Sequence, residues 1–275
     1  MKKIILLLSV TILLSGFISE NGHHSKGEKS GKGKKQTNSE SKKLFNGHDL
    51  EGWYTFVQKR GRNNDPKKVF TVSDGMIRIS GEEWGCITTE KEFENYHLTI
   101  EFKWGKLTFD PRLDKARDSG VLLHSIGEDG ASSEIWMNSI ECQVIEGGTG
   151  DFIVVGDGTD KFSVTSPVAA EKQNGSWLFK PDGKFVTINE GRINWYGRDP
   201  QWKDTKEFRG ANDVEKPVGQ WNKLECIADG NDITIILNGK KVNYATKVQP
   251  SKGKIQIQSE GAEIFVRKVE MKEIR

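Results

Sequence analysis

Residues 97–104 read His-Leu-Thr-Ile-Glu-Phe-Lys-Trp, with an apolar side chain at every second position. A period of two places alternate side chains on opposite faces of an extended strand, whereas an amphipathic helix would repeat every ~3.6 residues. The stretch therefore predicts a strand with one face in a core and the other in a polar environment.

Similar stretches recur from Leu44 onward, separated by turn residues. Hairpins are predicted at 69–80 and 232–244, where Asp74-Gly75 and Asn238-Gly239 tolerate the positive φ of a tight turn. Further strands are expected at 120–126, 140–146, 152–155, 185–189, 222–228, 254–259 and 263–272. Because no stretch has the periodicity of a helix, we expect an all-β fold, an antiparallel β-sandwich.

The beginning of the chain has the order of an export signal. Lys2 and Lys3 precede an apolar run at 4–14, which is too short for a membrane anchor, so residues 1–19 are predicted to be a signal peptide. Phe17 stands where a lipoprotein would carry its acceptor cysteine. We therefore expect an exported protein, periplasmic or secreted, with no lipid anchor and no stable membrane anchor.

Residues 20–43 contain no aliphatic or aromatic side chain, which predicts a disordered basic linker. The chain has 41 Lys+Arg against 39 Asp+Glu, but residues 1–43 carry a net charge of +6, which leaves −4 for residues 44–275. A mildly acidic body excludes nucleic acid as an expected partner, because such binding requires cations that neutralise phosphates. Residues 44–275 are long enough for one large β domain.

Three cysteines, an odd number for an exported protein, allow at most one disulfide. Cys86, Cys142 and Cys226 each lie in an apolar, strand-like run. We expect buried thiols that act as small hydrophobic side chains.

A polar pair interrupts the apolar strand at 139–145. Glu141 and Gln143 point to one face of that strand, which we expect to be solvated, while Ile140 and Cys142 point to the other. A bulge at Gly147-Gly148 would bring Glu146 to the same face.

The segment 118–124 reads Asp-Ser-Gly-Val-Leu-Leu-His, so strict alternation gives Asp118 and His124 a common face. If this strand lies in the same sheet, His124, Glu141 and Gln143 converge. A histidine beside a carboxylate suits proton transfer near neutral pH or ligation of a metal ion. An ordinary polar strand surface is the alternative.

Eight tryptophans are many for this length, and aromatic planes pack on the C–H faces of sugar rings. Trp84 and Trp136 lie beside predicted turns and are the candidates for a carbohydrate-binding surface. Long polar connections at 105–119 and 191–219 are expected to form the rim of a site.

Four ordered motifs resemble the 3-keto-disaccharide hydrolase domain family, and together they span most of residues 44–275. They are Leu-Phe-Asn-Gly-His-Asp-Leu-Glu-Gly-Trp at 44–53, the segments 118–124 and 139–145, Gly-Gln-Trp-Asn-Lys-Leu-Glu at 219–225 with Leu-Asn-Gly at 237–239, and Gly-Lys-Ile-Gln-Ile-Gln at 253–258 with 264–274. The resemblance implies a concanavalin-like (laminin G-like) jelly roll that cleaves glycosides oxidised at C3. Asp118 and His124 stand where many members have asparagine and arginine.

A ketone at C3 acidifies the C2 proton, so cleavage needs a base over C2, an acid at the leaving oxygen, and stabilisation of the C3 oxygen. We expect Glu141 or His124 to be the base and the other to be the acid or a metal ligand. The substrate contacts are expected from Gln143, Asp118, Glu146, Trp84 and Trp136.

Two alternatives remain open. One is a non-catalytic carbohydrate-binding module, because this fold often only binds. The other is a laminarinase-like retaining hydrolase, whose E-x-D-x-x-E strand is similar to 141–146 with Gln143 at the central position. The sequence indicates a carbohydrate partner, leaves a divalent metal ion open, and assigns no further cofactor and no oligomeric state.

Overall fold

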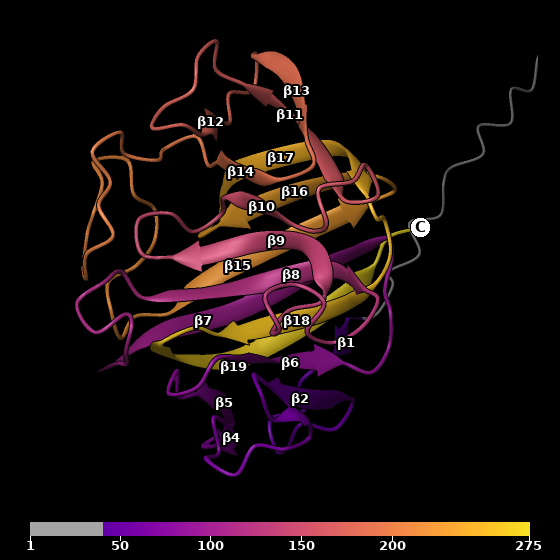
Figure 1. The fold of residues 1–275 in the computed structure, drawn as a ribbon, viewed down its shortest axis with the longest axis vertical. Coiled ribbons are helices and arrows are strands. Elements are labelled where there is room, and N and C mark those ends of the chain that lie inside the picture. The colour runs from indigo at the N-terminus through magenta and orange to yellow at the C-terminus, as the bar shows by residue number, and fades with distance from the viewer. Residues whose placement is uncertain (1–40) are drawn as a thin grey trace, which may run out of the picture. The chain divides into compact units, whose positions relative to one another are not determined.

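A computed structural model describes residues 41–275, and in this range the chain forms two stacked β-sheets without a helix (Figure 1). The predicted signal peptide and all but the last three residues of the predicted linker lie outside the described residues. No segment of 41–275 is a helix long and apolar enough to cross a bilayer. The predicted antiparallel β-sandwich is confirmed, with one parallel pair, β12 with β14.

The first sheet has the strand order β13-β11-β17-β16-β15-β7-β19-β5-β4, and β1 pairs with β19. Its strands are β1 (Lys42–Lys43), β4 (Phe70–Ser73), β5 (Met76–Ile79), β7 (Tyr96–Thr108), β11 (Ser163–Val168), β13 (Lys184–Ile188), β15 (Asn222–Asp229), β16 (Asp232–Leu237), β17 (Lys240–Gln249) and β19 (Ala262–Glu273).

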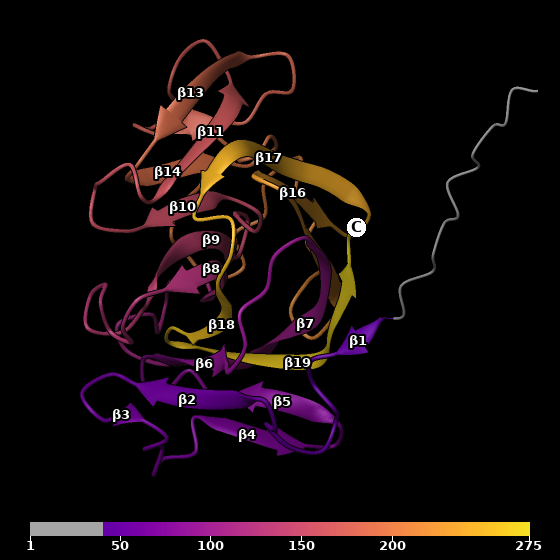
Figure 2. The ribbon, with the colours of Figure 1, turned by 90° about the vertical axis from the view of Figure 1, so that its right-hand side faces the viewer.

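The second sheet has the order β12-β14-β10-β9-β8-β18-β6-β2-β3 and carries the polar strand described above. Its strands are β2 (Trp53–Val57), β3 (Gly61–Arg62), β6 (Gly85–Thr89), β8 (Asp118–Ile126), β9 (Asn138–Ile145), β10 (Phe152–Val155), β12 (Trp177–Leu178), β14 (Gly191–Asn194) and β18 (Lys254–Ser259). Figure 2 shows β8, β9 and β10 on one side of the sandwich and β7 and β16 on the other.

The core lies between the two sheets and follows the predicted alternation. On β7, Leu98, Ile100, Phe102 and Trp104 are buried against the inward side chains of β8 and β9. All three cysteines are buried and free, as predicted, and Cys142 and Cys226 belong to this core.

The fold begins two residues before the predicted domain boundary. Lys42 and Lys43 form β1, which pairs with Met271 and Glu270 of β19. Strand pairing uses backbone groups, so a segment without apolar side chains can still join a sheet edge. Residues 42 and 43 therefore belong to the folded domain and not, as predicted from the sequence, to the linker.

Candidate functional site

Glu141 and Gln143 point away from the core, on the outer face of the second sheet. Glu141 pairs with Leu122 of β8 and Ile153 of β10, and both neighbours also face outward. The prediction that this face is solvated is wrong, because Glu141 is only 5% exposed and Gln143 only 4%. Connections between strands fold over the sheet and exclude water from these side chains.

Gly120 lets Glu141 and Gln258 close over the middle of this face. A Cβ atom added to Gly120 would lie 2.2 Å from Oε1 of Glu141 and 2.3 Å from Oε1 of Gln258. Both oxygens therefore occupy the space that any larger residue at 120 would fill. Gly120 has no positive φ, so its role here is to leave room.

Three carboxyl groups, which we call the acidic cluster, gather around this point: Asp118, Glu141 and Glu260. Burial raises the pKa of Glu141 to about 8, and the neighbouring charge of Asp118 adds to the shift. Burial also raises the pKa of Glu260 to about 8, with a further contribution from Glu141. The pKa of Asp118 is raised by burial and by Glu260.

Two arginines oppose these shifts. The charges of Arg112 and Arg192 lower the pKa of both Asp118 and Glu260, and Arg192 also lowers that of Glu141. Nη1 of Arg112 lies 3.1 Å from Oδ2 of Asp118. The cluster thus consists of three carboxyl groups with raised pKa values beside two arginine side chains that oppose the shift.

The amides near the cluster have unused acceptors. Gln143 donates through Nε2 to Oδ1 of Asp118 at 3.1 Å, but its own Oε1 accepts no hydrogen bond. Oε1 of Gln258 is buried and also has no partner. Buried acceptors without partners are costly, so both atoms call for a donor from a protonated neighbour or a ligand.

His124 does not join this cluster, and the prediction that it converges with Glu141 and Gln143 is wrong. The pairing of β8 with β9 shifts register between Leu123 and Ile126, and His124 has a positive φ of 54°. The bulge breaks the strict alternation on which the prediction rested.

The ring of His124 packs edge-on against Tyr96 of the core, with ring centroids 5.6 Å apart. Its Nδ1 donates to the carbonyl oxygen of Pro250 at 2.8 Å. Burial lowers the pKa of His124 to about 4, so the ring is neutral near pH 7.

Glu146 also lies elsewhere, because no bulge returns it to the outer face. Its Oε1 accepts from Nη1 of Arg117 at 2.8 Å, and its Oε2 accepts from the backbone N–H of Arg117 and of Glu207. Arg117 in turn donates to the carbonyl of Gly105 in the other sheet. Glu146 therefore forms a buried ion pair that connects the two sheets.

Trp84 and Trp136 do lie near one another on the outer face. They pack with Leu122, Cys86 and Ile135 in a small apolar cluster separate from the main core. Trp136 is buried and Trp84 is partly exposed, so only Trp84 presents an accessible surface. Leu122 connects this apolar cluster to Glu141 through their cross-strand pair.

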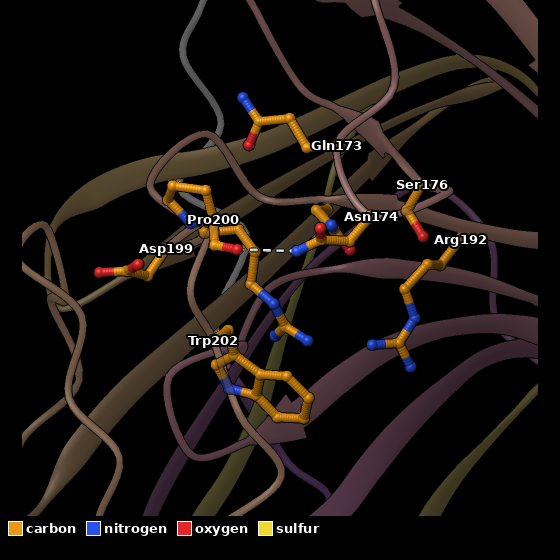
Figure 3. A pocket seen from close by; sticks show the side chains of 9 residues that line it. Gln173, Asn174, Ser176, Arg192, Asp199, Pro200 and Trp202 are labelled. Atoms are coloured by element: carbon orange, nitrogen blue, oxygen red, sulfur yellow. Dashed lines mark hydrogen bonds between the residues drawn. The ribbon is translucent and has the colours of Figure 1, made fainter.

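On the other side of Glu141 the surface is hollowed into what we call the Arg192 pocket, a cavity of about 290 Å³ (Figure 3). Arg192 on β14 pairs with Ile153, which pairs with Glu141, so the three lie in one row across the sheet. The lining includes Asn174, Ser176, Asn194, Arg198 and Trp202.

The sequence alone missed Glu260, Arg112, Arg192 and Gln258. Arg112, Arg192 and Arg198 do lie in or beside the connections predicted to form a rim. The sequence pattern could have identified Gln258. Gln256 and Gln258 alternate with the core residues Ile255 and Ile257, and this is the pattern that singled out Glu141 and Gln143. Glu260 follows that strand directly and had no signal of its own.

Within residues 41–275, no group of three or more histidine, cysteine or acidic side chains is arranged to hold a metal ion. His124 and Glu141, the candidate metal ligands, lie apart because the ring of His124 packs against Tyr96.

Comparison with known proteins places the chain among carbohydrate-active domains. The family model described as the 3-keto-alpha-glucoside-1,2-lyase-like domain matches residues 40–272. No curated protein is similar enough in sequence to be matched.

Among solved structures, a candidate glycosyl hydrolase from Parabacteroides distasonis is 19% identical, with 86% of this chain and 94% of that chain covered and a TM-score of 0.50. A β-glucanase of Bacillus licheniformis is 12% identical, with 87% and 100% covered and a TM-score of 0.42. At such identities the likeness concerns the fold alone.

Proposed function

Since this chain belongs to the family of 3-keto-alpha-glucoside-1,2-lyase-like domains, we propose that it is an exported enzyme that cleaves 3-keto-glycosides. The reaction is elimination of the C1 substituent after removal of the C2 proton, and water then adds to the enone product. Glu141 is the base, Glu260 the acid, and Gln143 and Gln258 contact the substrate.

The acidic cluster is the observation that carries this proposal. Burial raises the pKa of Glu141 and of Glu260 to about 8, and the charges of Asp118 on Glu141 and of Glu141 on Glu260 add to these shifts. At a pH near 8 the pair holds about one proton, so that an ionised carboxylate and a protonated carboxylic acid stand beside each other. An elimination needs this combination, because one group takes a proton while the other gives one.

The elimination transfers one proton to Glu141 and one proton from Glu260. Glu141 takes the proton from C2, and the electron pair of that C–H bond forms the C1–C2 double bond. The C1–O bond breaks, and its electron pair leaves on the oxygen, which takes the proton of Glu260. Negative charge that develops on the C3 oxygen faces Arg192 or Arg112, the cations that already act on the cluster.

The unused acceptors fit a carbohydrate. Oε1 of Gln143 and Oε1 of Gln258 are buried without partners. Sugar hydroxyl groups are donors that would satisfy both atoms, so binding of a polyol recovers hydrogen bonds that the free protein lacks.

The structure weakens the retaining-hydrolase alternative. A laminarinase-like mechanism needs a second carboxylate facing the first across the sugar. On this strand that residue would be Glu146, which is instead paired with Arg117 between the sheets.

Activity on a matched pair of substrates tests the proposal. The enzyme should turn over the 3-keto form of a nitrophenyl α-glucoside, leave the unoxidised glucoside intact, and exchange solvent deuterium into C2. Comparable turnover of the unoxidised glucoside without exchange would support a conventional glycosidase. Binding of either sugar without any turnover would instead indicate a carbohydrate-binding module.

Export rests on the predicted signal peptide at 1–19, with Phe17 in place of a lipid-accepting cysteine. Expressed with its native N-terminus, the protein should appear in the periplasm or medium and be released without detergent. Recovery in the membrane fraction after washing with high salt would contradict this part of the proposal.

A further inference from the structure

Asp151 is a fully buried carboxylate beside the acidic cluster, and the proposed reaction gives it no role. It directly precedes β10, where Phe152 faces the core and Ile153 faces outward, so alternation places Asp151 on the outer face. The backbone N–H of Gln143 donates to the carbonyl oxygen of Asp151 at 3.0 Å. Asp151 therefore lies next to the strand that carries Glu141.

Two arginines and one backbone N–H surround this carboxylate. Oδ2 of Asp151 lies 3.3 Å from Nη1 of Arg192 and 3.2 Å from Nη1 of Arg198. Its Oδ1 accepts from the backbone N–H of Trp195 at 2.8 Å. Burial raises the pKa of Asp151, whereas the two guanidinium groups and the N–H lower it. Since arginine is permanently charged, Asp151 is a buried counter-ion shared by two cations.

Arg192 connects Asp151 to the proposed base. Arg192 pairs with Ile153, and Ile153 pairs with Glu141, so all three lie in one row on the outer face. The side chain of Arg192 is 28% exposed, and Figure 3 shows it across the hollow from Trp202. A long, partly exposed side chain has many rotamers. Its contact with a buried carboxylate is what holds the guanidinium in one place.

The charge of Asp151 also acts on Glu141, with the opposite sign to that of Arg192. Arg192 lowers the pKa of Glu141, whereas Asp151 raises it. Asp118 on β8 and Glu260 after β18 also face Glu141, and the charge of Asp118 raises the same pKa. An arginine without a counter-ion would stabilise the carboxylate and make Glu141 a weaker base. Asp151 offsets this effect.

We propose that Asp151 is a positioning residue for the elimination, which holds the guanidinium of Arg192 beside Glu141 and offsets its charge so that Glu141 remains a strong base. The role of Glu141 as base rests on the proposed function. The coupling of Asp151, Arg192 and Glu141 is a property of the folded protein without substrate, so it can be measured whether or not the enzyme turns over a 3-keto-glycoside.

Titration of Glu141 by NMR tests this coupling. In protein labelled with ¹³C at the glutamate carboxyl carbons, the signal of Glu141 is the one that is absent from Glu141→Gln. In Asp151→Asn the pKa of Glu141 should fall from about 8 to about 7 or below, because a negative charge is removed and Arg192 loses its counter-ion. Glu225→Gln is the matched control, since Glu225 is also buried and pairs with Lys223, but in the other sheet. It should leave this titration unchanged.

The kinetics test the positioning of Arg192. In Asp151→Asn the acidic limb of the pH profile of kcat/KM on a 3-keto-glycoside should move to lower pH with the pKa of Glu141. The value of kcat on the plateau should fall at least about tenfold, because Arg192 is no longer held in place. An active, folded variant with an unchanged plateau overturns the positioning role.

A carboxylate that only stabilises the fold would give a different result. Asp151→Asn would then have a lower melting temperature and an unchanged pKa of Glu141, and this outcome overturns the proposal. If Asp151→Asn does not fold, the double variant with Arg198→Met replaces it, because one unpaired cation is removed, and the same fall in pKa is expected. If the wild type turns over no 3-keto-glycoside, the proposed function fails, and the NMR titration alone decides the coupling.

Discussion

Glu141 and Gln258 extend from strands on either side of β8 and meet over Gly120. A Cβ atom added to Gly120 would lie 2.2 Å from Oε1 of Glu141 and 2.3 Å from Oε1 of Gln258. Oε1 of Gln258 is buried and has no hydrogen-bond partner, and burial raises the pKa of Glu141 to about 8. The missing side chain at 120 therefore positions the proposed base.

Gly120→Ala should lower kcat/KM by about a hundredfold, because its Cβ displaces the end of Glu141 and a shift of this kind misaligns a catalytic group. Both obstructing atoms are the ends of flexible side chains, so the melting temperature should change by only a few degrees. Steady-state kinetics and thermal melting measure the two effects. Full activity in the variant would show that Glu141 need not occupy this position.

Glu141→Gln should lower kcat by a factor of about 10²–10⁴ on a 3-keto-glycoside, because it removes the base but keeps the shape of the side chain. Glu260→Gln should cause a smaller loss on substrates whose leaving group is already acidic, such as nitrophenol. Glu101→Gln is the control, since Glu101 pairs with Arg267 in the other sheet. A loss in the control as large as in Glu141→Gln would point to a general effect on folding.

The stability of the protein should fall between pH 5 and pH 8 through the acidic cluster. The pKa values of Glu141 and Glu260 rise from 4.5 to about 8 on folding, so the native state holds protons that the unfolded chain has released. Their stabilisation is complete below about pH 4.5 and is lost as the pH rises through 8. Glu141→Gln and Glu260→Gln should flatten this slope in denaturant titrations, and an unchanged slope would contradict the shifts.

Replacement of His124 by a residue of suitable shape should leave the catalytic activity intact. Asparagine tolerates the positive φ at this position and has an N–H that can reach the Pro250 carbonyl, so His124→Asn should keep kcat/KM within about threefold. His124→Ala should lower the melting temperature more, because it leaves a cavity beside Tyr96. Loss of kcat with an intact fold in His124→Asn would restore a catalytic role.

Glu146→Ala should destabilise the protein by about 3–5 kcal/mol, because it removes the buried carboxylate that pairs with the buried charge of Arg117 and leaves only the exposed Glu207 at 3.8 Å. The double variant Arg117→Met with Glu146→Leu should recover part of this loss in chemical denaturation. Folded protein from either variant should bind the 3-keto-glycoside normally. Weaker binding with unchanged stability would make Glu146 a substrate contact after all.

The sequence by itself determined the sandwich. Alternation at 97–104 and in the other strands sets which side chains enter the core, and this depends only on the period of an extended chain. The same rule placed Glu141 and Gln143 together on the outer face, and the ordered motifs identified the family that the family model also matches.

Only the tertiary structure decided which groups share the site. A bulge in β8 turns His124 into the core, an ion pair takes Glu146 between the sheets, and the chain beyond β18 brings Glu260 to Glu141. Alternation cannot predict these placements, because a single inserted residue reverses a face and a connection is free to fold over either one. Burial by those connections, which no local pattern encodes, is also what raises the pKa of the cluster.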